Sequence, residues 1–120
     1  MSAQTSAGVA RDAKSAVPYL DAEGLAAVVE RASVPVLIDF TADRCPPCRA
    51  MSPLIDALAR ELSANVVVAK VDVDQHPQLA ARFGILSIPT IVLFRDGQVV
   101  DQIIGAVPLE RLRERVHALQ

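Results

Sequence analysis

The chain has no tryptophan, and its 120 residues include only one tyrosine, three phenylalanines and two cysteines. Small secreted proteins that depend on disulfides carry four or more cysteines spread along the chain, so this composition excludes that class. The formal net charge is −2 and no stretch is rich in lysine and arginine, so nucleic acid is not expected as a partner. No run approaches the roughly 20 apolar residues of a membrane span, so no membrane partner is expected.

The remaining composition favours one folded domain. Hydrophobic residues make up 52% of the chain, which is enough to build a single core at this length. Residues 1–16 are rich in Ser, Ala, Thr and Gln, and they lack the apolar segment of roughly 7–15 residues that marks a secretory signal. We therefore expect a flexible lead-in over residues 1–16, one domain over residues 17–120, and a cytoplasmic location.

Hydrophobic periodicity predicts alternating strands and helices. The expected elements are an edge strand at 17–20, a helix capped by Asp21, a buried strand at 34–40, a helix from the cysteines to Leu62, a strand at 65–73, a short helix at 76–83, strands at 90–94 and 99–104, and a helix after Pro108. The turn at 95–98 contains Asp96-Gly97 and predicts an antiparallel hairpin. This order predicts an α/β fold, a mixed sheet with helices on both faces.

The two cysteines enclose two prolines, Cys45-Pro46-Pro47-Cys48, where a buried strand gives way to a helix. A disulfide across so short a loop stabilises little, so chemistry explains the pair better than a structural role. Cys45 is expected at the helix N-terminus, where unpaired N–H groups favour a thiolate, with Cys48 one turn further along the same face. Pro46 and Pro47 remove N–H donors while Arg44 adds a positive charge, and the sequence does not rank these opposing effects.

Asp39 is an acidic residue in the middle of an apolar strand. Burial raises the pKa of a carboxyl group, and such a group near the dithiol can act as a general base for Cys48. The alternative is an edge position that faces solvent. Lys70, also within a predicted strand, is a candidate partner for Asp39 across the sheet, although this pairing is the weaker expectation.

Pro89 stands at the start of a predicted strand, in Ser87-Ile88-Pro89-Thr90. A cis Ile88–Pro89 bond beside the dithiol leaves the Ile88 backbone free to pair with an extended substrate segment. An ordinary trans proline at a strand edge is the alternative that frequency alone favours.

Together these motifs resemble the thioredoxin family from about residue 17 to residue 119. The matching segments are Val36 to Phe40, Cys45-x-Pro47-Cys48, Pro53, Lys70 to Asp74, Phe83 to Thr90, Phe94-x-x-Gly97 and Gly105-Ala106. The resemblance implies a five-stranded thioredoxin fold with Cys45 as exposed nucleophile and Cys48 as resolving thiol. It also implies Asp39 as buried base and a cis Ile88–Pro89 loop. Substrate contacts are then expected at Arg44, Pro46, Pro47, Ile88, Pro89, Gly105 and Ala106.

The chain departs from the family pattern just before the nucleophile. Thr41 and Arg44 stand where the family has tryptophans, and Pro46 replaces the usual glycine. Arg44 is expected to favour acidic partner surfaces. Some segments are similar to a bacterial thioredoxin-2 subgroup with a cysteine-rich zinc-binding extension, but no cysteine precedes Cys45 here. No metal is therefore expected, and His76 and His117 are expected at the surface.

The leading hypothesis is a monomeric thiol–disulfide oxidoreductase that reduces disulfide-containing substrate proteins. It needs no bound cofactor, because a thioredoxin reductase is expected to supply the electrons. Two alternatives stay open at this point: a more oxidising disulfide isomerase, and a redox-silent binding module. A zinc site is weaker still, because two thiols leave it two ligands short unless chains dimerise.

Overall fold

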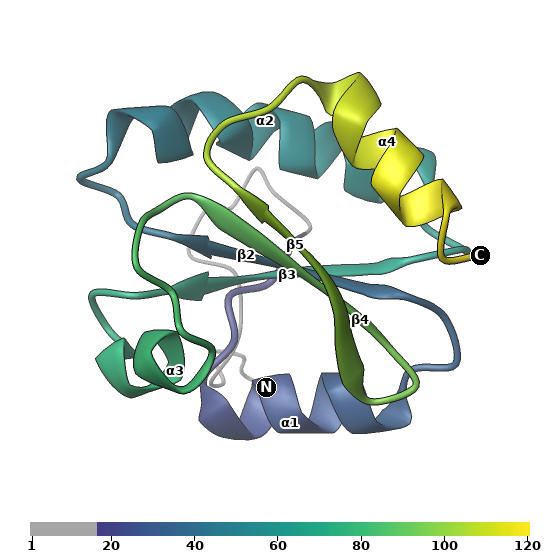
Figure 1. The fold of residues 1–120 in the computed structure, drawn as a ribbon, viewed down its shortest axis with the longest axis horizontal. Helices are drawn as coiled ribbons and strands as arrows, with labels where there is room; N and C mark the ends of the chain where they lie inside the picture. The colour runs from purple at the N-terminus through teal and green to yellow at the C-terminus, as the bar shows by residue number, and fades with distance from the viewer. Residues whose placement is uncertain (1–16) are drawn as a thin grey trace, which may run out of the picture.

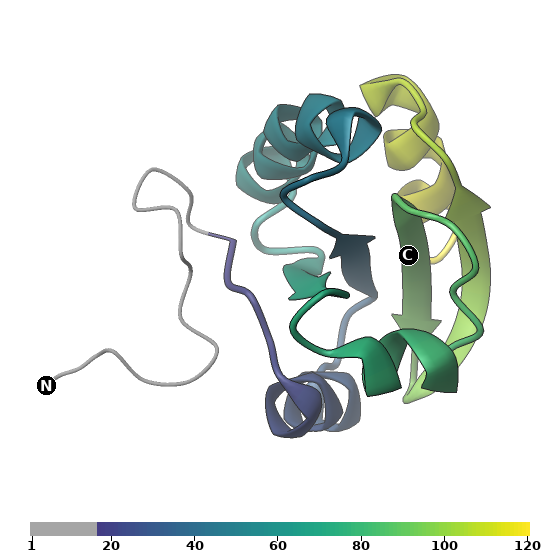
Figure 2. The same cartoon turned by 90° about the vertical axis from the view of Figure 1, so that its left-hand side faces the viewer.

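The computed structural model describes residues 17–120, in which four helices surround a four-stranded sheet (Figure 1). The helices are α1 (Ala22–Arg31), α2 (Pro46–Glu61), α3 (Pro77–Arg82) and α4 (Leu109–His117), and the strands are β2 (Val36–Thr41), β3 (Val67–Asp72), β4 (Thr90–Arg95) and β5 (Gln98–Ile104). Figure 2 shows α2 and α4 on one face of the sheet and α1 and α3 on the other, as predicted. The predicted lead-in at 1–16 lies outside the described residues, so the domain boundary at residue 17 stays a prediction.

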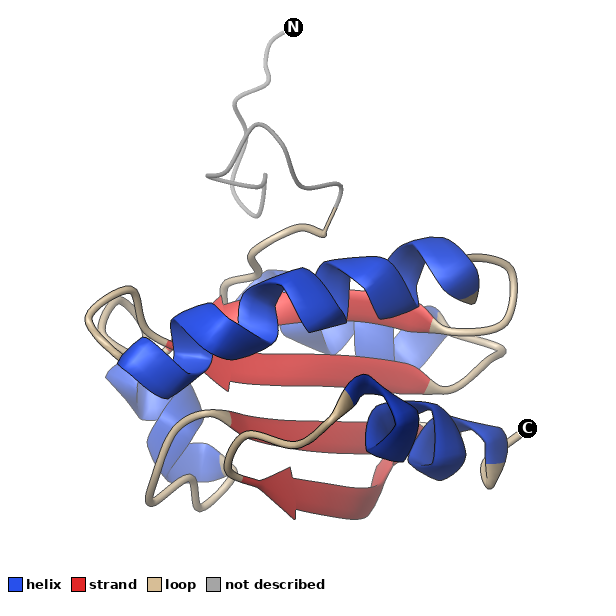
Figure 3. Cartoon of the chain, turned by 90° about the horizontal axis from the view of Figure 1, so that it is seen from above, coloured by secondary structure: helices blue, strands red, loops and turns tan. Residues whose placement is uncertain are grey.

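The strand order is β3-β2-β4-β5, which places β2 inside the sheet (Figure 3). Strand β2 runs parallel to β3 and antiparallel to β4, and β4 and β5 form the predicted hairpin. Asp96 and Gly97 in its turn have φ of 54° and 81°. These left-handed values at both central positions are typical of the tight turns that match strand twist.

The fifth strand expected at 17–20 is reduced to an isolated bridge between Tyr19 and Lys70. The Leu20 N–H donates to the Lys70 carbonyl at 2.8 Å, and the Lys70 N–H donates to the Pro18 carbonyl at 2.9 Å. In a parallel ladder, every second residue forms hydrogen bonds to the neighbouring strand. The next bond of this ladder would need an N–H of residue 18 to donate to the Val68 carbonyl, and residue 18 is a proline. Proline has no N–H, and the ladder stops there.

Two clusters of buried side chains fill the space on either side of the sheet. One lies under α2 and α4 and includes Leu37, Met51, Ile55 and Leu112, and the other lies under α1 and α3 and includes Leu25, Ile38 and Phe40. The second cluster holds all three phenylalanines, since the Phe83 ring centroid lies 5.8 Å from that of Phe40 and 5.6 Å from that of Phe94.

The predicted helix starts are largely confirmed. Asp21 caps α1 by accepting the Gly24 N–H at 2.8 Å. Helix α2 continues through Pro53 as one element, and its buried residues recur at helical spacing.

None of the helices within residues 17–120 is long and apolar enough to cross a membrane.

Candidate active site

The cysteines lie where the chain leaves β2 and enters α2. Cys45 is the N-cap of α2, and its sulfur accepts the Cys48 N–H at 3.3 Å. Pro46 and Pro47 occupy the first two helical positions, so the Cys48 amide is the first N–H that the helix can offer. Both cysteines are free thiols in this structure.

Cys45 is less accessible than the resemblance implied. It is 7% exposed, whereas Cys48 is 1% exposed, so Cys45 is the more accessible of the two thiols. The burial arises because Ala42 and Cys48 pack against Cys45, together with the half-buried Val73 and Ile88. The expectation of an exposed nucleophile is corrected to a thiol at the rim of a packed cluster.

Burial raises the pKa of the Cys48 thiol to about 11, and the hydrogen bond with Cys45 adds to this increase. Hydrogen bonds from the Ala42 backbone and the Thr41 side chain act in the opposite direction, because they stabilise the thiolate. Thr41 is thus a site residue in its own right, a role that the sequence comparison with tryptophan did not indicate. Its hydroxyl supplies polarity at the position where an indole would supply packing.

The loop before β4 closes over the dithiol, and its Ile88–Pro89 peptide bond is cis, which excludes the trans alternative. The Cys45 sulfur lies 3.8 Å from the Ile88 carbonyl oxygen, as donor to acceptor. The Gly105 N–H donates to the Pro89 carbonyl at 2.9 Å. The Val107 N–H donates to the Met51 sulfur at 3.4 Å, which ties this second loop to α2. The predicted contact residues at 88–89 and 105–106 therefore lie side by side.

Arg44 does not present a free charge to solvent. Its guanidinium pairs with Asp74, with an Nε–Oδ2 distance of 2.9 Å, and both side chains are exposed. An exposed pair of this kind contributes little to stability, but it offsets the positive charge that was expected to attract acidic partners. Pro46 and Pro47 are exposed beside it.

Asp39 is 1% exposed and lies between β3 and β4, which excludes the solvent-facing alternative. Burial raises the pKa of this carboxyl to about 7. The Lys70 charge lowers it, and the Asp56 charge raises it. The Asp39 Oδ1 atom has no hydrogen-bond partner among residues 17–120.

Lys70 is the backbone neighbour of Asp39 in the parallel pair, as predicted, but its ammonium contacts helix α2 instead. Lys70 Nζ lies 2.8 Å from Ser52 Oγ and 3.3 Å from Asp56 Oδ1. Sequence reasoning missed Ser52 and Asp56. The available signal is their four-residue spacing, which places both side chains on one face of a helix.

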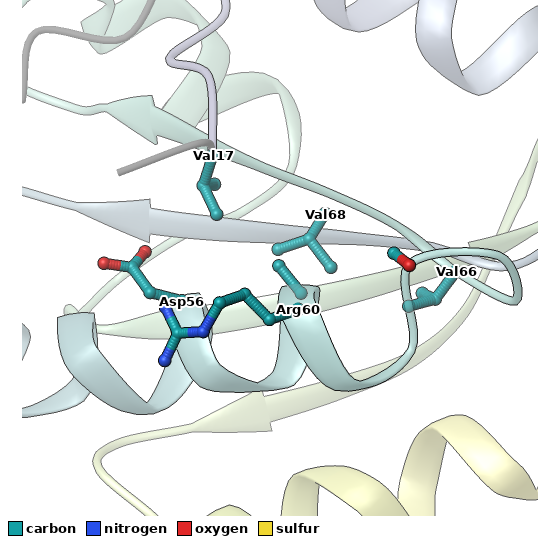
Figure 4. Close-up of a pocket in the computed structure, with 7 residues that line it drawn as sticks. Val17, Asp56, Arg60, Val66 and Val68 are labelled. Carbon is teal, nitrogen blue, oxygen red and sulfur yellow. The ribbon is translucent and has the colours of Figure 1, made fainter. Parts of the chain in front are cut away.

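Two pockets are lined by residues named above. The smaller, about 190 Å³, adjoins the cis-proline loop and is lined by Arg44, Ile88 and Leu86, among others. The larger, about 530 Å³, lies away from the cysteines between α2 and β3, where Asp56 and Arg60 face Val17 and Val68 (Figure 4). Within the described part of the chain, no group of three or more His, Cys, Asp or Glu side chains could hold a metal ion.

A free dithiol at a helix start, packed against a cis-proline loop and set in this sheet, defines a thiol–disulfide oxidoreductase of thioredoxin fold. The chain belongs to the thioredoxin family, whose sequence model, described as Thioredoxin, matches residues 16–118. It is a protein-disulfide reductase that works by dithiol exchange through Cys45 and Cys48. This membership argues against the alternative hypothesis of a redox-silent binding module.

Individual relatives and a solved structure support the same family assignment. The chain is 49% identical over 80 residues to thioredoxin 1 of Synechococcus elongatus, covering 67% of this chain and 75% of that protein. It is 39% identical over 107 residues to a chloroplastic M-type thioredoxin of Pisum sativum, covering 89% of this chain and 62% of that protein. The structure of mitochondrial thioredoxin 3 from Saccharomyces cerevisiae superposes with a TM-score of 0.78 at 30% identity, covering 86% of this chain and 95% of that one.

Proposed function

We propose that Cys45 is the attacking thiol and Cys48 the resolving thiol of this reductase. The Cys45 thiolate attacks one sulfur of a substrate disulfide, a mixed disulfide forms, and the first substrate thiolate leaves and takes up a proton. Cys48 then loses its proton and attacks the Cys45 sulfur, which releases the second substrate thiolate and leaves a Cys45–Cys48 disulfide. Two electrons and two protons pass to the substrate. The assignment is supported by the greater exposure of Cys45 and by the Cys48 N–H donated to its sulfur.

In this proposal Asp39 accepts the Cys48 proton. A thiol whose pKa is about 11 is almost fully protonated at neutral pH, so its attack needs a base. The carboxyl of Asp39 has a pKa of about 7, which suits a group that takes up and releases a proton near neutrality. Lys70 takes part through its charge, which stabilises the Asp39 carboxylate.

The substrate chain is proposed to dock across the two loops beside the dithiol. The proposed contact residues are Arg44, Pro46, Pro47, Ile88, Pro89, Gly105 and Ala106. Two observations support this surface: the hydrogen bond that joins the two loops at Gly105 and Pro89, and the neighbouring Leu86, which is 98% exposed. An exposed apolar side chain beside a reactive group is typical of a binding surface.

The wider setting follows from the family resemblance and is proposed on that basis alone. Electrons are supplied by a thioredoxin reductase, the protein works as a monomer without a bound cofactor, and it acts in the cytoplasm. Since the M-type thioredoxin of Pisum sativum is a chloroplastic protein, fractionation of the source cells is the direct check of location.

The observation that best supports the roles of the two thiols is their difference in burial. Trapping of the mixed disulfide in single-cysteine variants tests these roles. Cys48→Ser is expected to accumulate the mixed disulfide with a disulfide-containing substrate protein, whereas Cys45→Ser is expected to form none. The adducts are measured by non-reducing electrophoresis and mass spectrometry. Accumulation in Cys45→Ser alone would reverse the two assignments.

The direction of electron flow is tested by the reduction potential in glutathione buffers. Proteins that use such dithiols range from about −270 mV for reductants to about −120 mV for strong oxidants. We expect a value near the low end. A value well above about −200 mV would instead favour the disulfide isomerase, and it would mean that the reduced dithiol is stabilised in spite of the two N–H donors that Pro46 and Pro47 remove.

A further inference from the structure

The buried Lys70 ammonium lies within the reach of polar groups on two different elements, β2 and α2. Its backbone neighbour on β2 is Asp39, whereas its side chain reaches under α2 to Ser52 and Asp56, one helical turn apart. The Lys70 side chain is only 3% exposed, so its charge must be compensated inside the protein. The partner that it takes decides how strongly it stabilises the Asp39 carboxylate.

We propose that Ser52 and Asp56 are positioning residues that hold the Lys70 ammonium against α2, keep it from pairing with Asp39, and so leave the Asp39 carboxyl able to keep a proton for exchange. This inference rests on the proposed role of Asp39 as base. It assigns to two residues of α2 a function that neither performs by contact with a cysteine or a substrate.

The geometry supports the inference in two ways. First, Ser52 Oγ accepts from Lys70 Nζ at 2.8 Å and Asp56 Oδ1 lies 3.3 Å away, so two acceptors of α2 engage the ammonium. Second, the Asp39 Oδ1 atom lacks a hydrogen-bond partner among the described residues, although a lysine sits beside it in the sheet. An unpaired buried carboxyl oxygen favours the protonated, uncharged form.

The charges that act on Asp39 come from two of the elements packed around β2. Lys70 on β3 lowers the pKa of Asp39, and Asp56 on α2 raises it, while the facing residue on β4 is the apolar Ile91. The two cysteines lie at the start of α2. The ammonium also lies over the Tyr19 ring, with Lys70 Nζ 5.6 Å from the ring centroid.

Asp56 also connects this buried group to solvent. Its side chain is 20% exposed and lines the larger pocket, on the wall formed by α2 (Figure 4). Because Asp56 stays partly hydrated, it keeps its negative charge at a lower cost than Asp39 does. The ammonium therefore gains a hydrated counter-ion, and the fully buried carboxyl is left without one.

The test is a carbon-13 NMR titration of the Asp39 carboxyl in the reduced, full-length protein. Ser52→Ala is expected to lower the pKa of Asp39, because the ammonium becomes free to approach it. Asp56→Asn is expected to lower it further, by about one unit, because it frees the ammonium and also removes the negative charge of Asp56. Glu61→Gln and Ser63→Ala are matched controls, the first at the far end of α2 and the second just beyond it, and neither is expected to shift the titration.

A double-mutant cycle separates positioning from a general effect on packing. In a Lys70→Met background, Ser52→Ala is expected to leave the Asp39 titration unchanged, because its effect passes through the ammonium. The inference is overturned if Ser52→Ala leaves the pKa of Asp39 unchanged or raises it, or if the effect of Ser52→Ala persists without Lys70.

The rate of mixed-disulfide resolution, followed against pH in the same variants, tests the role of Asp39 separately. A resolution midpoint that follows the Asp39 titration supports both proposals. If the titration moves and the resolution midpoint does not, the positioning role stands and the role of Asp39 as base is overturned.

Discussion

Asp39 makes the stability of the protein depend on pH at the scale of a single residue. Its pKa is raised from 3.8 to about 7, so between these values the unfolded chain releases a proton that the folded chain retains. Stability from this group is fully present below about pH 4, falls as the pH rises, and is lost above about pH 7. A pKa change of this size corresponds to about 4 kcal/mol.

Replacing Asp39 by asparagine removes this titration. Asp39→Asn is expected to be more stable than the wild type above pH 7, by up to about 4 kcal/mol, and to flatten the pH dependence between about pH 4 and pH 7. Urea unfolding at several pH values measures the difference. Asp96→Asn, in the β4–β5 turn, is the matched control, because asparagine also accepts its positive φ. A wild-type stability that does not fall over this range would contradict the prediction.

Thr41 contributes one donor to the Cys48 sulfur. Thr41→Val keeps the shape of the side chain but removes the hydroxyl, so the pKa of Cys48 is expected to rise further and resolution to slow by roughly three- to tenfold at pH 7. Stopped-flow measurement of mixed-disulfide decay checks this. Thr41→Ser, which retains the hydroxyl, should stay close to the wild type; equal rates in the valine and wild-type proteins would rule the hydrogen bond out of resolution.

At the scale of elements, proline residues set the start of helix α2 and the end of the strand pairing beside β3. Pro46 and Pro47 start α2 without N–H groups, so its first amide is the one that contacts Cys45. Pro18 ends the pairing beside β3 because it cannot donate to Val68. One chemical property, the missing N–H, therefore shapes both the dithiol and the sheet edge.

Restoring this donor is expected to lengthen the sheet. In Pro18→Val the new amide at residue 18 can bond the Val68 carbonyl, and its hydrogen exchange should be slowed at least about tenfold relative to an unbonded amide. The Leu20 amide, already bonded to Lys70, is the internal reference. Global stability should change by less than about 1 kcal/mol, since the added bond is offset by the greater freedom of the unfolded chain. Rapid exchange at residue 18 would show that another feature ends the ladder.

At the scale of the whole molecule, the protein carries a net charge of −2, and the Arg44–Asp74 pair neutralises a cation next to Cys45 in the chain. Asp74→Asn frees this cation. The reaction of this variant with a peptide whose disulfide is flanked by acidic residues is expected to be severalfold faster than that of the wild type at low ionic strength. This increase in rate should vanish in about 0.5 M salt. Asp96→Asn makes the same change in net charge away from the site and should show no acceleration. A gain that survives high salt would exclude an electrostatic cause.

The sequence predicted the elements whose cause is local. Asp21 caps its helix and Asp96-Gly97 turns its hairpin through bonds and dihedral angles set by neighbouring residues. The burial of Asp39 was also predictable, because it interrupts an apolar strand. The contact between Arg44 and Asp74 joins residues 30 positions apart, and that between Lys70 and Ser52 joins residues 18 apart, so neither leaves a periodic pattern to detect.

The contact between Tyr19 and the Lys70 ammonium has a practical consequence. Tyr19 is the only tyrosine in a chain that has no tryptophan, so the near-ultraviolet absorption and emission of the protein come almost entirely from this ring. The ring lies over the cation that Ser52 and Asp56 engage and whose field reaches Asp39. The protein thus contains an intrinsic chromophore beside its buried charges, and we expect its emission to change when the charges between the sheet and α2 change.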